Sequence, residues 1–416
     1  MVVLQVVVTG GAGQIAYSLI PLIARGLVFG PATRVHLRLL DIPPAAQALE
    51  AIVMEIQDSL FPTALEGVLG TTDEVRAFEG AQVAILLGGF PRKPGMERGQ
   101  LMAKNVGIMK RMGQLLERHA SRDCKALVVA NPAATNCLVL AANAPSLPRK
   151  NFSFLSRLDH ERMVGMLLEK ANSVLAAGTA SHAVRSERLR PADVRGLCIW
   201  GNHSDSQVPD ASSVEFCLNG NWVPAQTILG DSPWLKLQDA NAVAGAGGGD
   251  YLSEAVRNRG AVILAARKLS SAMSAANATA AHLGDWLCSP PTGKTVSMGV
   301  FSDGNPFGVP EGLVCSFPVQ CGDLSGANRG GWNFDSDFRL TEDVSRQLAV
   351  SVAELEEERE MAFSILNGGQ STPSEGPPSS APVVVSTATA NGTGNGTLGR
   401  AANGAVNISK KPISSL

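Results

Sequence analysis

The chain has 416 residues, of which 45% are hydrophobic and 17% are charged, and its formal net charge at pH 7 is −2. This length predicts two folded domains with appendages, and the near-neutral charge argues against nucleic acid or an anionic membrane as a partner. No apolar run reaches the roughly 18 residues that a membrane-spanning helix needs, so we expect a soluble globular protein.

Strand and helix patterns alternate along residues 1–154. The expected strands are Val2–Val8, Val35–Leu40, Val83–Leu87 and Ala126–Ala130. The expected helices are Ile15–Ala24, Ala46–Asp58 and Met102–His119. Short apolar strands that alternate with helices predict an α/β domain with a doubly wound parallel sheet.

The pattern becomes mixed in residues 155–366, which we expect to form a second α/β domain. The expected helices are Arg162–Ala171, Asp250–Arg267, Ser270–Leu287 and Thr341–Leu366. The expected strands are Leu197–Trp200, Ser213–Leu218, Val296–Phe301 and Val314–Val319. Residues 173–190 and 240–249 have the composition of surface insertions, and their role is open. Residues 367–416 are rich in Gly, Ser, Thr and Pro, which predicts a disordered tail.

The two ends of the chain and its cysteines give indications of the cellular compartment and of disulfide or metal sites. No cationic leader or cleavage site precedes the first apolar residues, so we expect a cytoplasmic protein. The last residues, Ser414-Ser415-Leu416, distantly resemble a peroxisomal Ser-Lys-Leu signal, which makes peroxisomal import an alternative. The seven cysteines are scattered and lack a C-x-x-C pair, so we expect neither a disulfide framework nor a metal site.

A glycine-rich turn follows the first predicted strand and opens the first predicted helix. It consists of Gly10, Gly11, Ala12, Gly13, Gln14, Ile15 and Ala16. In this context the first glycine permits a tight turn, Gly13 lets a pyrophosphate approach the backbone, and Ala16 permits close helix packing. An ordinary strand–helix turn is the alternative interpretation.

Two further features favour dinucleotide binding at this turn. Asp41 closes the second predicted strand, where an acid can hold the ribose hydroxyls of NAD and repel the 2′-phosphate of NADP. Gly88-Gly89 ends the next predicted strand, where a side chain would obstruct a cofactor. We therefore predict NAD as the cofactor.

Polar residues elsewhere suggest a site for an acid substrate. Arg92, Arg98 and Arg162 carry planar guanidinium groups that match carboxylates two-to-two, so a pocket that holds them would select a substrate with more than one carboxylate. Histidine as a residue type has an unperturbed pKa near the working pH, so His203 is a candidate proton acceptor, and a carboxylate such as Asp159 could fix its tautomer. Sequence alone does not bring these two residues together.

Several long motifs carry a resemblance to a known family. They are Val8–Tyr17, Pro91–Arg98, Asn131–Asn136, Arg157–His160, Trp200–Ser204 and Arg267–Ala276. In this order, across roughly residues 1–366, the chain resembles the cytosolic-type malate dehydrogenases of the lactate/malate dehydrogenase family. The resemblance implies a Rossmann NAD-binding domain at residues 1–154, a substrate domain at 155–366 and a homodimer. It also implies reversible oxidation of malate to oxaloacetate.

The resemblance also implies roles for single residues. It makes His203 the proton acceptor and Asp159 its carboxylate partner. It makes Arg162 the anchor of the C1 carboxylate, Arg98 the group that polarises the C2 carbonyl, and Arg92 the group that binds the second carboxylate. Further expected contacts with substrate or cofactor are Asn105, Val129, Ala130 and Asn131, the last at the substrate edge of the nicotinamide pocket.

Some positions depart from the family pattern or carry no signal for function. Ala134 stands where the family usually has Asn, and Met112 where a glutamine near the cofactor is usual, so contacts at both are in doubt. We expect a structural or surface role for His160 and a solvated helix face at Glu354–Glu358. The chloroplast NADP-dependent branch has regulatory cysteines in terminal extensions, whereas this chain has none after Cys321, so thioredoxin control is not expected.

Two alternatives remain beside malate dehydrogenase. One is a dehydrogenase for lactate or another 2-hydroxyacid, which Arg92 argues against, because a monocarboxylate would leave its guanidinium unpaired. The other is a dinucleotide-binding protein without catalysis, which the intact set of chemical residues disfavours.

Overall fold

A nine-stranded sheet forms the centre of the computed structural model, which describes residues 3–61, 64–91, 96–177, 188–237, 251–288, 294–322 and 330–368. Its strand order is β14-β13-β12-β6-β5-β4-β1-β2-β3. The strands are β1 Leu4–Thr9, β2 Val35–Leu40, β3 Leu65–Thr71, β4 Val83–Leu86, β5 Lys125–Val128, β6 Phe152–Phe154, β12 Thr295–Phe301, β13 Val314–Cys321 and β14 Trp332–Phe334. The strands from β3 to β6 pair in parallel in the order 3-2-1-4-5-6, which confirms the predicted doubly wound fold.

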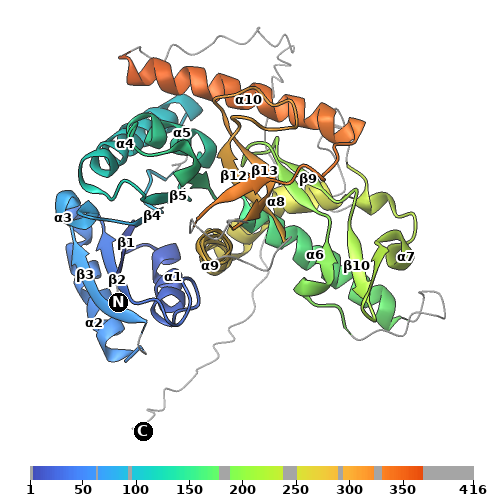
Figure 1. Cartoon of the computed structure of the whole chain (residues 1–416), viewed down its shortest axis with the longest axis horizontal. Helices are drawn as coiled ribbons and strands as arrows, with labels where there is room; N and C mark the ends of the chain where they lie inside the picture. Colours follow the sequence, from blue (N-terminus) through green and yellow to red (C-terminus); the bar gives the residue numbers. More distant parts are fainter. Residues whose placement is uncertain are drawn as a thin grey trace, which may run out of the picture. The chain divides into compact units, whose positions relative to one another are not determined.

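Helices cover both faces of this sheet (Figure 1). Helix α1 (Gln14–Ala24) packs with α9 (Met273–Leu287), while α4 (Arg98–His119), α5 (Ala133–Ala142) and α10 (Glu342–Leu366) pack together. Helix α2 (Ala46–Asp58) and the short α3 (Glu74–Phe78) contact β3. Because parallel strands are buried from both faces, their side chains are apolar, and Val6, Val7 and Val8 are fully buried.

Besides α9 and α10, the second half of the described chain adds smaller sheets and three further helices. One small sheet joins β7 (Val194–Arg195), β10 (Glu215–Leu218) and β11 (Asn221–Pro224), and another pairs β8 (Cys198–Trp200) with β9 (Val208–Asp210). The helices are α6 (Arg157–Ala176), α7 (Gln226–Leu229) and α8 (Leu252–Arg267). Short 3-10 turns lie at Pro43–Ala45, Arg149–Asn151, Pro191–Asp193 and Pro233–Leu235. A second hydrophobic cluster around Phe216, Leu167 and Val256 stabilises this part.

The main sheet continues across residue 154, where we expect the domain boundary. β12 pairs antiparallel with β6 at Gly299 and Phe154, and the ring of Phe154 occupies the space that a Cβ at position 299 would need. A glycine is therefore required at this crossing, and all the described residues belong to one compact unit.

Four elements of the first half were absent from the prediction: β3, α3, α5 and β6. In β3 the residues Glu66, Gly67 and Gly70 interrupt the apolar pattern, and β6 has only three residues. The predicted third strand, Val83–Leu87, is therefore β4. The remaining predicted helices and strands are present with ends shifted by a few residues.

The predicted insertions have different outcomes. Residues 173–176 are the last residues of α6, and Leu189 is 4% exposed in the second hydrophobic cluster, so the ends of the segment 173–190 are part of the folded domain. The prediction of a surface excursion was wrong there. Residues 178–187, 240–249 and 369–416 lie outside the described residues.

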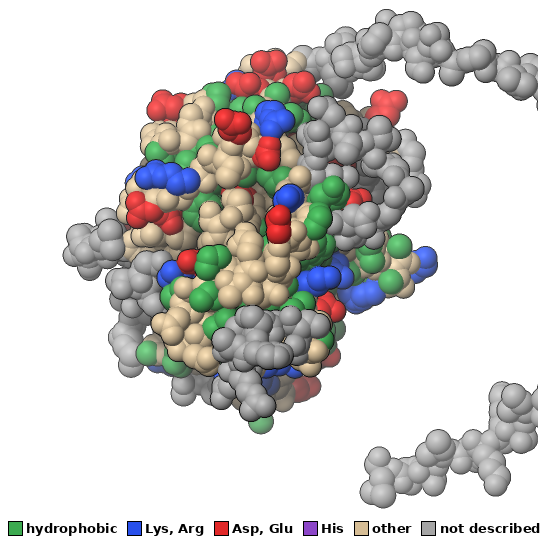
Figure 2. Space-filling view, turned by 90° about the vertical axis from the view of Figure 1, so that its right-hand side faces the viewer, with side chains coloured by type: hydrophobic (Ala, Val, Ile, Leu, Met, Phe, Trp, Pro, Cys, Tyr) green, Lys and Arg blue, Asp and Glu red, His purple; other side chains and the backbone are tan. Residues whose placement is uncertain are grey.

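The surface of the described residues has a mixed character. On the face in Figure 2, acidic and basic side chains are interspersed, with hydrophobic side chains between them. Among the helices of the described part, none has the length and apolar content needed to cross a bilayer. All seven cysteines are free thiols, and Cys288 is exposed.

Candidate active site

The turn between β1 and α1 approaches the neighbouring strands very closely. Gly10 has a φ of +67°, and a Cβ there would lie 2.9 Å from the Cα of Gly88. A Cβ at Gly11 would lie 2.9 Å from that of Leu39. Gly13 is the N-cap of α1 and offers no side chain to the first backbone N–H groups of the helix. Such N–H groups attract an anion such as a pyrophosphate.

The first residues of α1 support the same interpretation. Gln14 is exposed and Ile15 is half-buried, whereas Ala16 is 1% exposed and packs into the main core. A small residue at this position lets the helix lie close to the sheet. The helix N-terminus is thereby held over the carboxyl end of β1.

Asp41 follows β2 beside this turn. Its Oδ2 accepts a hydrogen bond from the backbone N–H of Ala12 at 3.0 Å, and its Oδ1 accepts one from Ile42 at 2.8 Å. Asp41 is only half-buried, so part of the residue remains exposed to solvent. This is the arrangement that an acid needs to accept hydrogen bonds from ribose hydroxyls.

The cofactor residues predicted from later strands lie in different environments. Asn105 is fully buried; its Oδ1 accepts from the N–H of Phe90 at 2.9 Å, and its Nδ2 donates to the carbonyls of Phe90 and Leu101. Its amide therefore holds the segment after β4. Asn131 is exposed at the end of β5, where Val129 is half-buried and Ala130 is 8% exposed.

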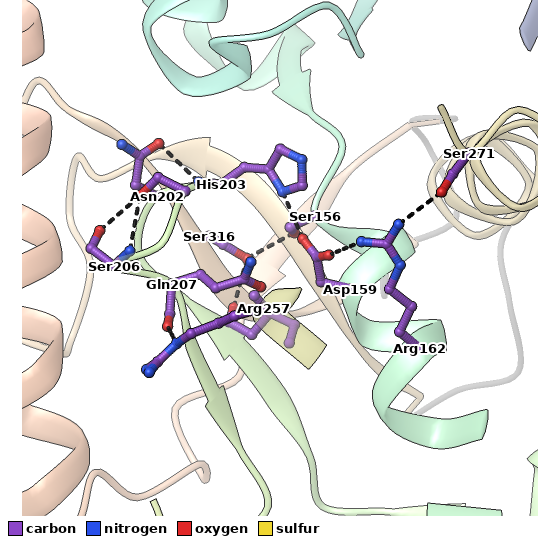
Figure 3. A network of polar contacts seen from close by, with 12 residues as sticks. Ser156, Asp159, Arg162, Asn202, His203, Ser206, Gln207, Arg257, Ser271 and Ser316 are labelled. Atoms are coloured by element: carbon purple, nitrogen blue, oxygen red, sulfur yellow. Dashed lines mark hydrogen bonds and ion pairs between the residues drawn. The ribbon is translucent and has the colours of Figure 1, made fainter. Parts of the chain in front are cut away.

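His203 and Asp159, which lie 44 positions apart, are joined by a hydrogen bond of 2.6 Å between Nδ1 and Oδ2 (Figure 3). The other carboxylate oxygen of Asp159 accepts from Arg162 Nη1 at 2.9 Å. The second terminal nitrogen of Arg162 donates to Ser271 at 3.2 Å. The structure thus brings together three of the predicted site residues.

Local structure explains how these side chains meet. Asp159 lies in the first turn of α6, is 1% exposed and points toward the loop that follows β8. His203 lies in that loop, directly after Trp200, Gly201 and Asn202, and Trp200 is fully buried. The buried tryptophan fixes the end of β8, and the histidine keeps 20% of its side chain exposed.

The electrostatics of the pair favour an ion pair. Burial alone lowers the pKa of His203, but the charge of Asp159 and its hydrogen bond outweigh burial, so the pKa lies above its ordinary value. Burial likewise raises the pKa of Asp159, but His203 and Arg162 outweigh it and lower the pKa. His203 beside Asp159 therefore holds its proton more strongly than a histidine with the ordinary pKa would.

The residues at the site follow neighbouring parallel strands of one sheet. Gly10 follows β1, Asp41 follows β2, Gly88 follows β4, Asn131 follows β5 and Asp159 lies shortly after β6. The carboxyl ends of parallel strands lie along the same edge of a sheet, and ligands bind at that edge where the strand order reverses, here between β1 and β4. The glycine turn and the histidine–aspartate pair therefore belong to one edge.

The structure describes the side chain of only one of the three predicted arginines. Arg92 lies outside the described residues. Arg98 begins α4, but its side chain is outside the described set. Of the three, Arg162 is the one whose side chain is described, and it contacts Asp159 and Ser271, so the grouping of the three arginines stays a prediction.

The acidic run Glu354–Glu358 was wrongly predicted to be a solvated face. Glu358 is 5% exposed and accepts a hydrogen bond from Thr135, and Glu354 accepts hydrogen bonds from the His203 loop. Helical spacing could have found Glu358. It belongs to the buried stripe Val344, Leu348, Ser351, Leu355, Glu358 and Ala362.

Other doubtful positions have clear surroundings. Ala134 is 1% and Met112 is 7% exposed, and both pack in the main core. His160 shares a hydrogen bond of 2.9 Å with Ser297 and its pKa lies well below the ordinary value because of burial, which agrees with a structural role. Among the described residues, no group of three or more His, Cys, Asp or Glu is placed to hold a metal ion.

The fold and the site define a class, the dinucleotide-binding dehydrogenases. Comparison with known proteins narrows it. The family model for the lactate/malate dehydrogenase NAD binding domain matches residues 4–153, and that for the alpha/beta C-terminal domain matches residues 157–366. The chain belongs to the lactate/malate dehydrogenase family.

Individual relatives agree with this assignment. A malate dehydrogenase of Nicotiana tabacum is 44% identical over 362 residues, which cover 87% of this chain and 98% of that protein. A cytoplasmic malate dehydrogenase of Felis catus is 41% identical over 364 residues, with 88% and 98% covered. These matches confirm the predicted resemblance to cytosolic-type malate dehydrogenases, and the NAD binding domain confirms the predicted cofactor.

Solved structures show the same fold. The malate dehydrogenase of Naegleria fowleri has a TM-score of 0.73 at 36% identity and covers 88% of this chain and 99% of its own. The lactate dehydrogenase of Trichomonas vaginalis in complex with NADH and oxamate has a TM-score of 0.74 at 31% identity, with the same coverage. A malate dehydrogenase and a lactate dehydrogenase thus share this fold, so the fold alone does not show which of the two activities this chain has.

Proposed function

We propose that this chain is an NAD-dependent malate dehydrogenase that interconverts (S)-malate and oxaloacetate. The observation that carries the proposal is the 2.6 Å hydrogen bond between His203 and a buried Asp159 that Arg162 also contacts. This arrangement offers a proton acceptor and a carboxylate anchor side by side. The high identity to cytoplasmic malate dehydrogenases supports the choice of substrate.

The proton chemistry follows from the histidine pair. When bound, NAD supplies the acceptor for the hydride from C2 of malate. The free Nε2 of His203 removes the proton from the C2 hydroxyl, so that the C–H and O–H bonds break and a C=O bond forms. Asp159 stabilises the imidazolium that results, and its bond to Nδ1 keeps the tautomer that leaves Nε2 free to accept.

Three arginines bind the substrate in this proposal. Arg162 anchors the C1 carboxylate, Arg98 polarises the C2 oxygen and Arg92 binds the far carboxylate. Asn131 contacts the substrate at the edge of the nicotinamide pocket. Asn131 is exposed at the end of β5, and the guanidinium of Arg162 points toward Asp159 (Figure 3). Both observations support these assignments.

The cofactor site accounts for a preference for NAD over NADP. The Gly10–Ala16 turn supplies backbone N–H groups for the pyrophosphate, and Asp41 accepts from the ribose hydroxyls. A 2′-phosphate would meet the charge of Asp41, which repels it. Val129 and Ala130 line the strand end beside the nicotinamide, whereas Asn105 acts by holding the backbone of Phe90.

We further propose two domains at residues 1–154 and 155–366, a homodimer and a cytoplasmic location. Exposed Tyr17 and Met54, on the outer faces of α1 and α2, are apolar side chains that a second subunit could cover. The names of the cytoplasmic relatives support the location. Sedimentation equilibrium tests the dimer, and a single species of monomer mass at micromolar concentration would overturn it.

A lactate dehydrogenase is the second candidate, favoured by the similarity to the Trichomonas vaginalis enzyme. The deciding experiment compares kcat/KM for oxaloacetate and pyruvate by the loss of NADH absorbance. We expect oxaloacetate to be favoured, and Arg92→Gln to lower that preference by roughly 10²- to 10⁴-fold, which is the worth of a bidentate charged contact. A pyruvate preference in the native enzyme would establish the alternative.

The same assay distinguishes an active dehydrogenase from a protein that binds NAD without catalysis. Binding of NADH without any oxaloacetate-dependent oxidation would support it. In an active enzyme, His203→Asn should abolish turnover and leave NADH binding unchanged, since the substitution removes the proton acceptor without touching the glycine turn.

A further inference from the structure

The loop that carries His203 is held from the side by α10. One carboxylate oxygen of Glu354, Oε2, accepts hydrogen bonds from three side chains of this loop: Asn202 at 3.1 Å, Ser204 at 2.5 Å and Ser206 at 2.6 Å. These residues flank His203 on both sides in the sequence. Hydrogen bonds to a charged acceptor are shorter and roughly twice as strong as neutral ones, so this oxygen is a firm anchor.

Asn202 connects the anchor directly to the histidine backbone. Its Nδ2 donates to Glu354, and its Oδ1 accepts from the backbone N–H of His203 at 2.8 Å. The side-chain amide is planar, so fixing its nitrogen also fixes its oxygen. The carboxylate of Glu354 thereby restrains the backbone position from which the imidazole projects.

Ser351, one helical turn before Glu354, adds contacts to the same loop. Its hydroxyl accepts from the backbone N–H of Asn202 at 2.8 Å and shares a hydrogen bond of 2.9 Å with Ser206. The helix lies so close that the Ser351 hydroxyl fills the space of a Cβ at Gly201, where φ is +86°. The loop has no room to relax toward α10 and depends on these contacts for its position.

We propose that Glu354 is a positioning residue for catalysis, because it holds the 202–206 loop so that His203 meets Asp159 and the substrate hydroxyl. The inference rests on the proposed function, since it concerns the same site. Glu354 is remote from the reacting atoms and acts through Asn202, Ser204 and Ser206. A displacement of about 1 Å in a reacting group can lower turnover by roughly 10²-fold, so loss of this anchor should be visible in kcat.

The test compares two substitutions with a matched control. Glu354→Gln keeps the shape but removes the charge, and Glu354→Ala removes all three acceptor contacts. Glu357→Gln is the control, because Glu357 lies exposed on the same helix and loses the same charge. We expect kcat to fall by about 10-fold for Glu354→Gln and by up to about 100-fold for Glu354→Ala. KM for oxaloacetate and the Kd of NADH should stay within about 3-fold, since the arginines and the glycine turn are unchanged.

A second measurement does not require turnover. The pKa of His203, followed by NMR of histidine-labelled protein and assigned with His203→Asn, should fall in both Glu354 variants, because a loosened loop weakens the bond to Asp159. If the native enzyme oxidises no NADH, the proposed function fails while this titration still tests the positioning. The positioning role is refuted if both Glu354 variants keep the native kcat and the native titration of His203, even if their Tm is lower. If Glu354→Ala fails to fold, the Gln variant and Ser206→Ala carry the same comparison.

Discussion

Replacing Asp159 by Asn tests how the site holds a proton. Two unit charges about 4 Å apart interact by about 4 kcal/mol at an effective dielectric constant of about 20. The side chain of His203 is 20% exposed and that of Asp159 is 1% exposed, so we discount the value modestly for screening. About 3 kcal/mol of imidazolium stabilisation then disappears, which corresponds to roughly 10²-fold in kcat.

The assay measures oxaloacetate reduction and malate oxidation as a function of pH, with NADH binding measured separately. In Asp159→Asn we expect both rates to fall, NADH affinity to stay unchanged, and the pH limb of reduction to move to lower pH, because burial still lowers the pKa of His203 while the opposing carboxylate is gone. Asp205→Asn is the control, since Asp205 is exposed in the same loop. A loss of less than about 5-fold in kcat with an unmoved pH limb would refute the reasoning.

Three further predictions concern the native enzyme and the cofactor site. In the proposed mechanism, oxaloacetate reduction needs protonated His203 and malate oxidation needs the neutral form. With rising pH, pH–rate profiles should therefore show reduction falling and oxidation rising through one pKa above the ordinary 6.5. Gly10→Ala should destabilise the fold by about 1–3 kcal/mol and weaken NADH binding, because φ at Gly10 is +67° and Gly88 occupies the space of the new Cβ. Thermal unfolding and NADH titration measure the two effects, and an unchanged Tm would contradict the prediction. Asp41→Asn should weaken NADH binding by about 10-fold and reduce the enzyme's preference for NADH over NADPH, since hydrogen bonds to a charged acceptor contribute about 1.5–3 kcal/mol. The same ratio of NADH to NADPH affinity in the native and variant enzymes would count against the role of Asp41.

The sequence allowed most of the doubly wound sheet to be predicted, because buried parallel strands are short apolar runs bounded by turn residues. It failed where that pattern is interrupted. Strand β3 contains Gly67 and Gly70, and it is stabilised by pairing with β2 and by contact with α2 and not by its own composition. A strand of this kind is defined by its neighbours, which no local pattern records.

The site shows a similar division. Gly10 and Asp41 lie in local motifs whose geometry is fixed by nearby residues, so their positions followed from the sequence. His203 and Asp159 are paired only by the tertiary fold, and the sequence associated them through family resemblance. The amide of Asn105 faces the backbone of Phe90, an orientation that depends on the path of the segment after β4 and has no signal in the sequence.

Glu354 and Glu358, which the sequence predicted to be solvated, both accept hydrogen bonds from other parts of the chain. Glutamates in a helix are usually solvated, but these two lie four positions apart on one face of α10, where side chains are neighbours. Glu358 accepts from Thr135 in α5, directly after the turn that carries Asn131, and Glu354 accepts from the loop that carries His203. Helix α10 packs against α4 and α5 and, further along its length, against β9 and β13 (Figure 1). One helix therefore contacts both the segment that follows Asn131 and the loop that carries His203, two residues that the proposed function assigns to the substrate site and that lie 72 positions apart in the sequence.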